Sequence, residues 1–285
     1  MGKINYKMLG VVTLYNPDVE SVIKSISKYA AVLDRLVIWD NSLPEKKTRE
    51  KIEPELRKVC SDMYWHSDGR NTFIAAAINY AWNMAKEENY DLVLTMDQDS
   101  SWDNFSDYRH RIECMMSHGT VEVYTPYIMG CDKWKMTENV QYRKLYINSG
   151  TVYPTKILTD IGGADERFPL DALDHDLAIR VQEKGYKIVC ITNCILHHKM
   201  GTPTKSKFFP LKANNYPAWR TYMITYSQVL NYRKHRKWFT SSEIFRVIKD
   251  FIVMRMLGIV LLENDKKAKI KMLCKGITDG FKAKL

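Results

Sequence analysis

The chain has 285 residues, of which 45% are hydrophobic and 27% are charged, and this composition is that of a globular protein with one large core. It argues against intrinsic disorder. Six scattered cysteines form no C-x-x-C pair, which is typical of reduced structural thiols. No apolar run reaches the roughly 20 residues of a bilayer-spanning helix, and the first residues do not resemble a secretory signal, so we expect a cytoplasmic protein.

The net charge of +10 is distributed unevenly along the chain. Residues 1–198 hold 24 Lys and Arg against 28 Asp and Glu, whereas residues 199–285 hold 19 against 5. A basic tail suits an anionic membrane surface, an acidic polymer or nucleic acid, or it is simply a solvated face. Charge alone does not choose among these.

Strand and helix patterns alternate through the first hundred residues. Strands are predicted at residues 8–14, 35–39, 63–66 and 92–96, and helices at residues 19–31, 45–59 and 74–88. This alternation predicts a mainly parallel α/β sheet that is covered by helices on both faces. Such sheets bind ligands at the carboxyl ends of their strands. The polar residues there are Thr13, Asn16, Asp40, Asn41 and those at 68–71 and 97–100.

The pattern is less regular after residue 100. A helix is predicted at 105–116, a strand at 122–125, a polar loop or insertion at 130–143, and strand and loop elements at 145–153 and 187–191, which bracket a helix that begins near Asp174. From Pro217, which suits the first turn of a helix, the remaining chain is mostly helical by pattern.

The predicted strand at 92–96 ends in two carboxylates one residue apart, Asp97 and Asp99. Carboxylate oxygens suit a hard divalent ion such as Mg²⁺ or Mn²⁺, which keeps open positions for the oxygens of a diphosphate. The triplet alone also fits a solvated turn. Its place after the fourth strand of an alternating pattern favours the metal site.

Several motifs, in order, resemble the glycosyltransferase family 2 enzymes with the GT-A fold, most closely the bacterial rhamnosyltransferases that build surface polysaccharides. The resemblance covers most of the chain. The matching segments are 11–18, 37–42, 71–79, 94–100, 148–150, 161–168, 173–180 and 198–201. It implies a GT-A catalytic domain at 1–215, with a nucleotide-binding part at about 1–100 and an acceptor part at about 101–215, followed by a helical C-terminal extension at 216–285.

The resemblance also implies roles for single residues. It places Thr13, Asn16, Asp40 and Asn41 at the base and ribose, Asn71 near the ribose or diphosphate, Asp97 near the ribose and metal, and Asp99 on the metal. His198, at the family's H-x-x-G spacing, can contact the metal or the diphosphate, whereas His197 can simply pack. Arg220 either approaches the diphosphate or lies on an ordinary helix face.

Transfer from a nucleoside diphosphate sugar needs charge neutralisation on the departing diphosphate and a base for the acceptor hydroxyl. The family pattern points to Asp174 as the base, with Asp176 and Asp171 as alternatives. A carboxylate at Asp174 would also be favoured by the helix dipole. His175 stands where the rhamnosyltransferases usually have Thr. The implied reaction is inverting, from a β-linked donor to an α-linked product.

We expect dTDP-L-rhamnose as the donor and a glycan or lipid-linked acceptor, with UDP-galactose or UDP-glucose as alternative donors. A nucleotide-sugar-binding protein without activity is disfavoured by the complete acidic set. A nucleic-acid-binding protein is an alternative from another class, but the tail shows neither base-reading aromatics nor a helix-turn-helix. An apolar stripe at 244–261 and the lysines of 266–284 predict either a peripheral position on the inner membrane face or a homodimer through the C-terminal helices.

Overall fold

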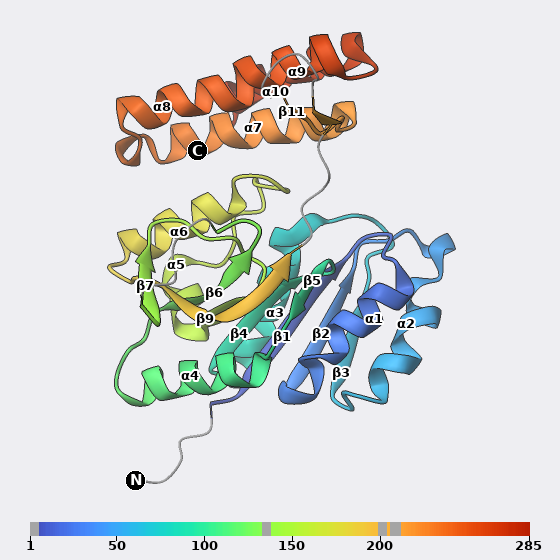
Figure 1. Cartoon of the computed structure of the whole chain (residues 1–285), viewed down its shortest axis with the longest axis vertical. Coiled ribbons are helices and arrows are strands. Elements are labelled where there is room, and N and C mark those ends of the chain that lie inside the picture. The colour runs from blue at the N-terminus through green and yellow to red at the C-terminus, as the bar shows by residue number, and fades with distance from the viewer. Residues whose placement is uncertain (1–5, 133–137, 199–203, 206–211) are drawn as a thin grey trace. The chain divides into compact units, whose positions relative to one another are not determined.

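The structure is a computed structural model that describes residues 6–132, 138–198, 204–205 and 212–285 (Figure 1). The chain forms two compact units. Unit 1 comprises Met1–Ala164 and Arg180–Lys199, and unit 2 comprises Asp165–Ile179 and Met200–Leu285. The division at residue 215 into a catalytic domain and an extension is a functional one and stays a prediction.

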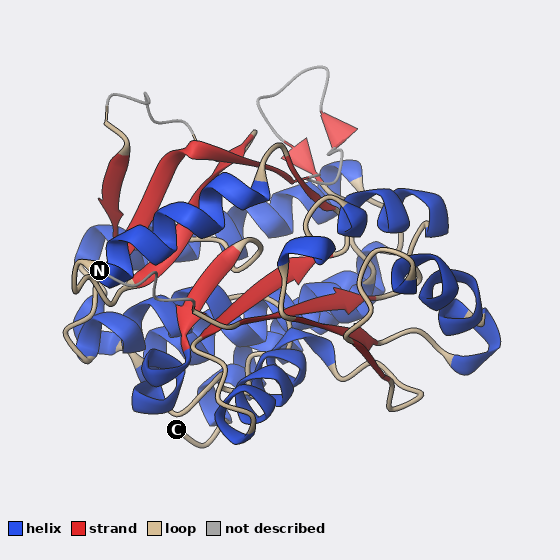
Figure 2. Cartoon of the chain, turned by 90° about the horizontal axis from the view of Figure 1, so that it is seen from below, coloured by secondary structure: helices blue, strands red, loops and turns tan. Residues whose placement is uncertain are grey.

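Unit 1 is built on a mixed sheet of nine strands, drawn in red in Figure 2. Their order is β3-β2-β1-β4-β8-β6-β9-β5, and β7 pairs with β9. The strands are β1 (Met8–Leu14), β2 (Arg35–Asp40), β3 (Met63–His66), β4 (Leu92–Asp97), β5 (Ser100–Trp102), β6 (Val123–Met129), β7 (Val140–Arg143), β8 (Thr151–Pro154) and β9 (Ile188–His198). The first four pair in parallel, as predicted, whereas β8 runs antiparallel to β4.

Helices cover both faces of this sheet. They are α1 (Val19–Ser27), α2 (Thr48–Arg57), α3 (Phe73–Glu87), α4 (Phe105–Ser117) and α5 (Thr155–Ile161), with short 3₁₀ turns η1 (Ala30–Val32) and η2 (Pro44–Lys46). Met8, Val12 and Leu14 of β1 share one buried cluster with residues of α1, α2 and α4. Successive strand residues point to opposite faces of a sheet. Helix α3 packs on β1 and β4, and together with α5 it covers the face opposite to α1, α2 and α4.

The structure differs from the sequence prediction mainly between residues 100 and 198. The predicted polar loop at 130–143 ends in strand β7, antiparallel to β9, while residues 133–137 of that loop lie outside the described residues. Strand β5 and helix α5 were not predicted, because three and seven residues are too few to establish a hydrophobic period. Strand β9 is longer than predicted, since it continues to His198.

Unit 2 is largely helical, and α6 (Leu173–Glu183) runs from it into unit 1. Its other elements are β10 (Thr204–Lys205), β11 (Lys212–Ala213), α7 (Ala218–Lys234), η3 (Arg236–Trp238), α8 (Ser241–Val247), the π-helical η4 (Ile248–Val253), α9 (Met254–Leu262) and α10 (Lys266–Lys282). Pro217 caps α7 rather than occupying its first turn. Helix α10 lies directly on α7, where a Cβ at Gly276 would approach the Tyr222 carbonyl oxygen to 2.7 Å.

A buried carboxylate joins the end of α9 to the start of α10. Lys269 Nζ donates to Glu263 at 2.9 Å, and Arg255 donates to the same carboxylate, which is fully buried. Burial alone would raise the pKa of Glu263, but the two cations hold it below its ordinary value. Part of the positive charge of the tail is therefore neutralised within unit 2.

All six cysteines are free in the structure. Among the residues that the structure describes, no helix is long and apolar enough to cross a membrane.

Candidate active site

The two carboxylates Asp97 and Asp99 lie where the chain reverses after β4. Asp97 ends β4, a two-residue turn follows, and Ser100 begins β5. Strand β5 lies beside β9 (Figure 1). The two strands pair antiparallel in a register that sets Ser100 opposite His198. Residues almost a hundred positions apart are thereby brought to one edge of the sheet.

The three residues predicted as metal ligands lie together in unit 1. His198 Nδ1 is 3.4 Å from Asp99 Oδ1, and one ligand atom each from Asp97, Asp99 and His198 lies within 4.8 Å of the other two. Among the described residues no other group of three His, Cys, Asp or Glu side chains meets this condition. Two carboxylates and one imidazole form an oxygen-rich donor set that fits Mg²⁺ or Mn²⁺.

The electrostatics of this group also fit a cation. Burial raises the pKa of Asp97 to about 6; the charge of His198 opposes the rise and that of Asp99 adds to it. Asp99 is 43% exposed and His198 16% exposed, so one carboxylate and the imidazole remain accessible. A divalent ion would compensate two neighbouring carboxylates that otherwise repel each other.

Side chains with no predicted role hold the turn in place. Gln98 Oε1 accepts from the Tyr15 amide at 2.8 Å, and its Nε2 donates to the Tyr15 carbonyl at 3.1 Å. Ser149 Oγ accepts from the Asp97 amide at 3.1 Å and donates to Ser100 Oγ at 2.7 Å. Ser100 Oγ lies 2.8 Å from His198 Nδ1, so this serine pair orients the imidazole ring.

The motif at 148–150 matched the family without an assigned role, and the structure supplies one. Thr95 Oγ1 donates to the Asn148 carbonyl at 2.7 Å. Gly150 has a φ of +80°, and a Cβ there would come within 2.7 Å of Leu196 and 2.8 Å of Pro126. Only glycine fits this position, which lets Ser149 reach the turn after β4.

The residues predicted at the base and ribose lie at the aligned ends of β1 and β2. Thr13 is the register partner of Asp97 on one side and of Trp39 on the other. The Asn16 amide donates to Ser42 Oγ at 2.9 Å, and the Ser42 amide donates to Asp40 Oδ1 at 2.9 Å. Burial raises the pKa of Asp40, and the bonds from Ser42 oppose the rise.

Asp40 also lines a cavity of about 450 Å³ in unit 1. Ser42, His66, Ser67 and Gly69 contribute to the same wall. The cavity adjoins the ends of β2 and β3, so it is a space at the strand edge where the sequence predicted a ligand.

Asn41 and Asn71 use their side chains within the protein. Asn41 Oδ1 accepts from the Thr72 amide at 2.9 Å, and its Nδ2 donates to the Phe73 carbonyl at 3.3 Å. Asn71 Oδ1 accepts from the Phe73 amide at 2.9 Å. Both side chains therefore position the start of α3, and direct contact with a nucleotide stays a prediction for them.

Unit 2 contains the three aspartates considered as bases. Asp174 lies in the first turn of α6. The fully buried Asp176 accepts from Lys234 Nζ at 2.6 Å and is 2.8 Å from His235 Nε2. Lys234 also donates to Asp165 at 2.6 Å. Because Asp176 is inaccessible and is held by Lys234 and His235, it fits a structural role. Asp174 as the base stays a prediction.

Arg220 lies on α7 in unit 2. Its guanidinium is 4.4 Å from the centre of the Tyr216 ring. Its charge opposes the rise that burial causes in the pKa of Asp171. The segment after His198 that resembled the family, residues 199–201, lies outside the described residues.

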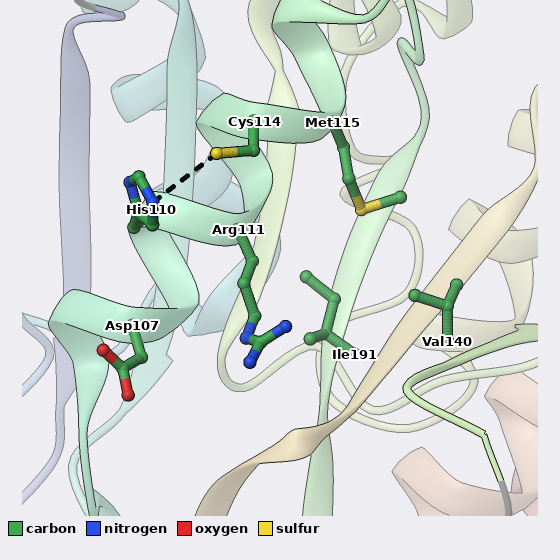
Figure 3. Close-up of a pocket in the computed structure, with 7 residues that line it drawn as sticks. All are labelled: Asp107, His110, Arg111, Cys114, Met115, Val140 and Ile191. Atoms are coloured by element: carbon green, nitrogen blue, oxygen red, sulfur yellow. Dashed lines mark hydrogen bonds between the residues drawn. The ribbon is translucent and has the colours of Figure 1, made fainter.

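A further cavity of about 410 Å³ lies beside α4 (Figure 3). Figure 3 shows Arg111 extending from α4 beside Ile191, and His110 Nε2 lies 3.6 Å from Cys114 Sγ. None of the residues predicted for the site lines this cavity, so it is not part of the site.

We expect His198→Ala to weaken Mn²⁺ binding by about 10-fold or more, because a missing ligand is not replaced by the remaining two carboxylates. Electron paramagnetic resonance of Mn²⁺ titrated into the full chain measures this. His197→Ala is the matched control, since His197 is adjacent on β9 but bonds Asp103 at 2.9 Å. Equal Mn²⁺ affinity of the two variants would contradict a ligand role for His198.

No protein-family model matches the chain. The chain is 21% identical over 217 residues to the dTDP-rhamnosyl transferase RfbF of Shigella flexneri, an alignment that covers 70% of this chain and 71% of that protein.

Solved structures of transferases share the fold. GalNAc-T7 with UDP, GalNAc and Mn²⁺ has a TM-score of 0.63 at 11% identity, covering 97% of this chain and 56% of that one. S. aureus TarS has a TM-score of 0.56 at 13% identity, covering 97% and 49%. The mannosyltransferase PcManGT of Pyrobaculum calidifontis with GDP-Man and Mn²⁺ has a TM-score of 0.53 at 12% identity, covering 98% and 76%. This chain thus spans about half the length of the first two, and it has the GT-A fold that the sequence predicted.

Proposed function

We propose that the protein is a metal-dependent glycosyltransferase that moves a sugar from a nucleoside diphosphate sugar to an acceptor hydroxyl. The observation that carries this proposal is the group of Asp97, Asp99 and His198 at the end of β4 in a GT-A fold. An oxygen-rich ligand set at the carboxyl end of a central parallel strand is suited to a diphosphate and its divalent ion.

Each residue then has a part in the reaction. Asp99 and His198 hold the ion, and Asp97 contacts the ribose or the ion. A divalent ion bound there supplies charge neutralisation for the departing diphosphate. Asp174 takes the proton of the acceptor hydroxyl while that oxygen forms the new bond to the anomeric carbon and the bond to the diphosphate breaks. A single displacement of this kind inverts the anomeric configuration.

The nucleotide lies over the ends of β1, β2 and β4 in this proposal. Thr13, Asn16 and Asp40 are available there for the base and ribose, while Asn41 and Asn71 shape the same edge through the start of α3. Arg220 is assigned to the diphosphate by family resemblance alone.

The donor that we propose is dTDP-L-rhamnose. The likeness to RfbF and the Asp97-Gln98-Asp99-Ser100 motif support this choice, and UDP-galactose and UDP-glucose are the alternatives. The acceptor would be a glycan or a lipid-linked sugar of a surface polysaccharide.

Donor identity can be tested by calorimetry and by hydrolysis or transfer assays. In the presence of Mn²⁺ we expect dTDP to bind the wild type more tightly than UDP does, and Asp99→Ala to lose at least 10-fold in affinity because one metal ligand is gone. Turnover of UDP-galactose without turnover of dTDP-L-rhamnose would overturn the donor assignment. Nucleotide binding that needs no metal and is unaffected by Asp99→Ala would overturn the site.

The base can be tested separately from the donor. Asp174→Asn is expected to lower the transfer rate by about 10²- to 10⁴-fold, because general base catalysis contributes that much, with little change in nucleotide affinity. Asp279→Asn, at a half-buried carboxylate of unit 2 that accepts from the Tyr222 hydroxyl at 3.0 Å, is the control and should keep its rate. An Asp174→Asn variant with wild-type transfer would assign the base elsewhere.

We further propose that unit 2 binds an anionic membrane surface. Large apolar side chains of α8, η4 and α9 are exposed at helical spacing: Phe245, Ile248, Val253, Leu257, Val260 and Leu261. Phe245 is 68% exposed and Leu261 55% exposed. The exposed Lys266, Lys267 and Lys271 follow on α10. An apolar face together with exposed basic charge suits lipid headgroups, and a peripheral enzyme would meet a lipid-linked acceptor there.

We expect the double variant Phe245→Asp and Leu261→Asp to lose at least 10-fold in affinity for phosphatidylglycerol vesicles, because it places charge on the apolar face. Vesicle co-sedimentation measures the affinity, and nucleotide binding should not change. Tyr142→Asp, at a 64% exposed aromatic residue of unit 1, is the control. Loss of a dimer in the double variant, with no vesicle binding by the wild type, would assign the face to a homodimer.

A further inference from the structure

We propose that a cavity within unit 2, bounded by Asp171, Asn214 and Phe251, is a binding subsite for one neutral sugar ring of the acceptor. Its identity as an acceptor subsite rests on the proposed transferase function. The cavity itself and its chemistry do not, since they follow from the contacts of unit 2 alone.

The cavity is formed by segments that the fold of unit 2 brings together. Its volume is about 260 Å³, many times the roughly 10–15 Å³ that one water requires. The polar and aromatic side chains that line it are Asp171, Asn214, Tyr216, Asp250, Phe251 and Arg255. They come from the loop before α6, the segment before α7, and the η4 and α9 helices, so the site is built by tertiary structure rather than by one motif.

Two residues that line this cavity, Asp171 and Arg255, each carry a buried polar atom without a hydrogen-bond partner in the described part of the chain. Among the described residues, none bonds Asp171 Oδ2, although the atom is shielded from solvent. The same holds for the Nε atoms of Arg255, which lines the cavity, and of Arg220, whose charge acts on Asp171. Buried polar atoms without partners are rare and costly in folded proteins. An unsatisfied acceptor and an unsatisfied donor on two residues that line one cavity therefore indicate a ligand that both donates and accepts hydrogen bonds.

Hydroxyl groups have this dual capacity. A sugar hydroxyl donates to the Asp171 carboxylate, which can only accept when ionised, and accepts from a guanidinium N–H, which can only donate. Phe251 offers an apolar surface to the C–H face of a ring. Asn214 Nδ2 bonds the Tyr216 hydroxyl at 2.9 Å, which leaves its carbonyl oxygen as a further acceptor for the ligand.

The charge of the cavity favours a neutral ligand over an anion. Asp171 and Asp250 both line it. The Arg255 guanidinium is already paired with the buried Glu263 carboxylate. The Arg220 guanidinium lies over the Tyr216 ring and faces the charge of Asp171. A phosphate or carboxylate would meet the carboxylates of Asp171 and Asp250, and the charge of Arg255 is already paired with Glu263, so repulsion disfavours it.

The position of Asp171 in the chain links the cavity to catalysis. Asp171 precedes Asp174 by three residues within unit 2, so their Cα atoms are at most about 11 Å apart. A ring held at Asp171 would keep an acceptor close to the proposed base. This gives Asp171 a binding role, where the sequence pattern had suggested it only as an alternative base.

The experiment measures binding of methyl glycosides to the full chain by saturation-transfer NMR and calorimetry. The probes are the methyl glycosides of L-rhamnose, D-glucose, D-galactose and N-acetyl-D-glucosamine. We expect at least one to bind the wild type and Asp171→Asn to weaken it by about 10-fold or more, because a hydrogen bond to a charged group is lost. Asp279→Asn is the control. The melting temperature of Asp171→Asn should equal or exceed that of the wild type, since an unpaired buried charge is removed.

Calorimetry of dTDP and UDP with Mn²⁺ on the same samples separates this inference from the proposed function. Nucleotide binding without binding of any glycoside, or equal glycoside binding by Asp171→Asn and wild type, would overturn the subsite alone. Asp171-dependent glycoside binding without nucleotide binding would uphold the subsite and overturn the transferase function. Binding of inorganic phosphate that Asp171→Asn strengthens would assign the cavity to an anion and overturn the inference.

Discussion

The antiparallel pairing of β5 with β9 is the constraint on which the candidate metal site depends. It forces the chain to reverse directly after Asp97, so both carboxylates stand at the sheet edge, and it sets His198 opposite Ser100. Gln98 and Ser149 then lock the turn to β1 and to the loop before β8. A one-residue slip of this pairing would turn His198 to the other face and place His197 at the site.

A second constraint operates in unit 2, where Asp176 anchors the first turns of α6. Lys234 and His235 at the end of α7 hold its carboxylate, and Lys234 also binds Asp165. Burial would raise the pKa of Asp165, but Arg167 and Lys234 keep it below its ordinary value. Breaking such a buried cluster by removing one partner typically costs about 3–5 kcal/mol. The start of the helix that carries Asp174 is thus held by ion-paired side chains within unit 2.

Part of the positive charge of the basic tail is likewise neutralised by ion pairs within unit 2. Arg255 and Lys269 form ion pairs with Glu263, and Lys234 forms ion pairs with Asp165 and Asp176. The charges of these cations therefore stabilise the fold. Exposed basic side chains that remain for an external surface include Lys266, Lys267 and Lys271 of α10, which follow the exposed apolar side chains of α9 in the chain. Basic charge together with exposed apolar side chains supports the proposal of a lipid surface.

The sequence by itself determined the α/β alternation, the parallel strands β1 to β4, and the carboxylates at the end of β4, because hydrophobic period and turn chemistry are local properties. The family resemblance added His198 and Asp174. Only the tertiary structure decided which aspartate is enclosed, what Asn41 and Asn71 bond, and how Asp171 comes to line a cavity with Phe251. The short strand β5 and the edge strand β7 were also not predicted. Each depends on partners 50 to 100 residues away, as in the pairing of Val140 with Ile191 or of Ser100 with His198, and no local pattern records such a contact.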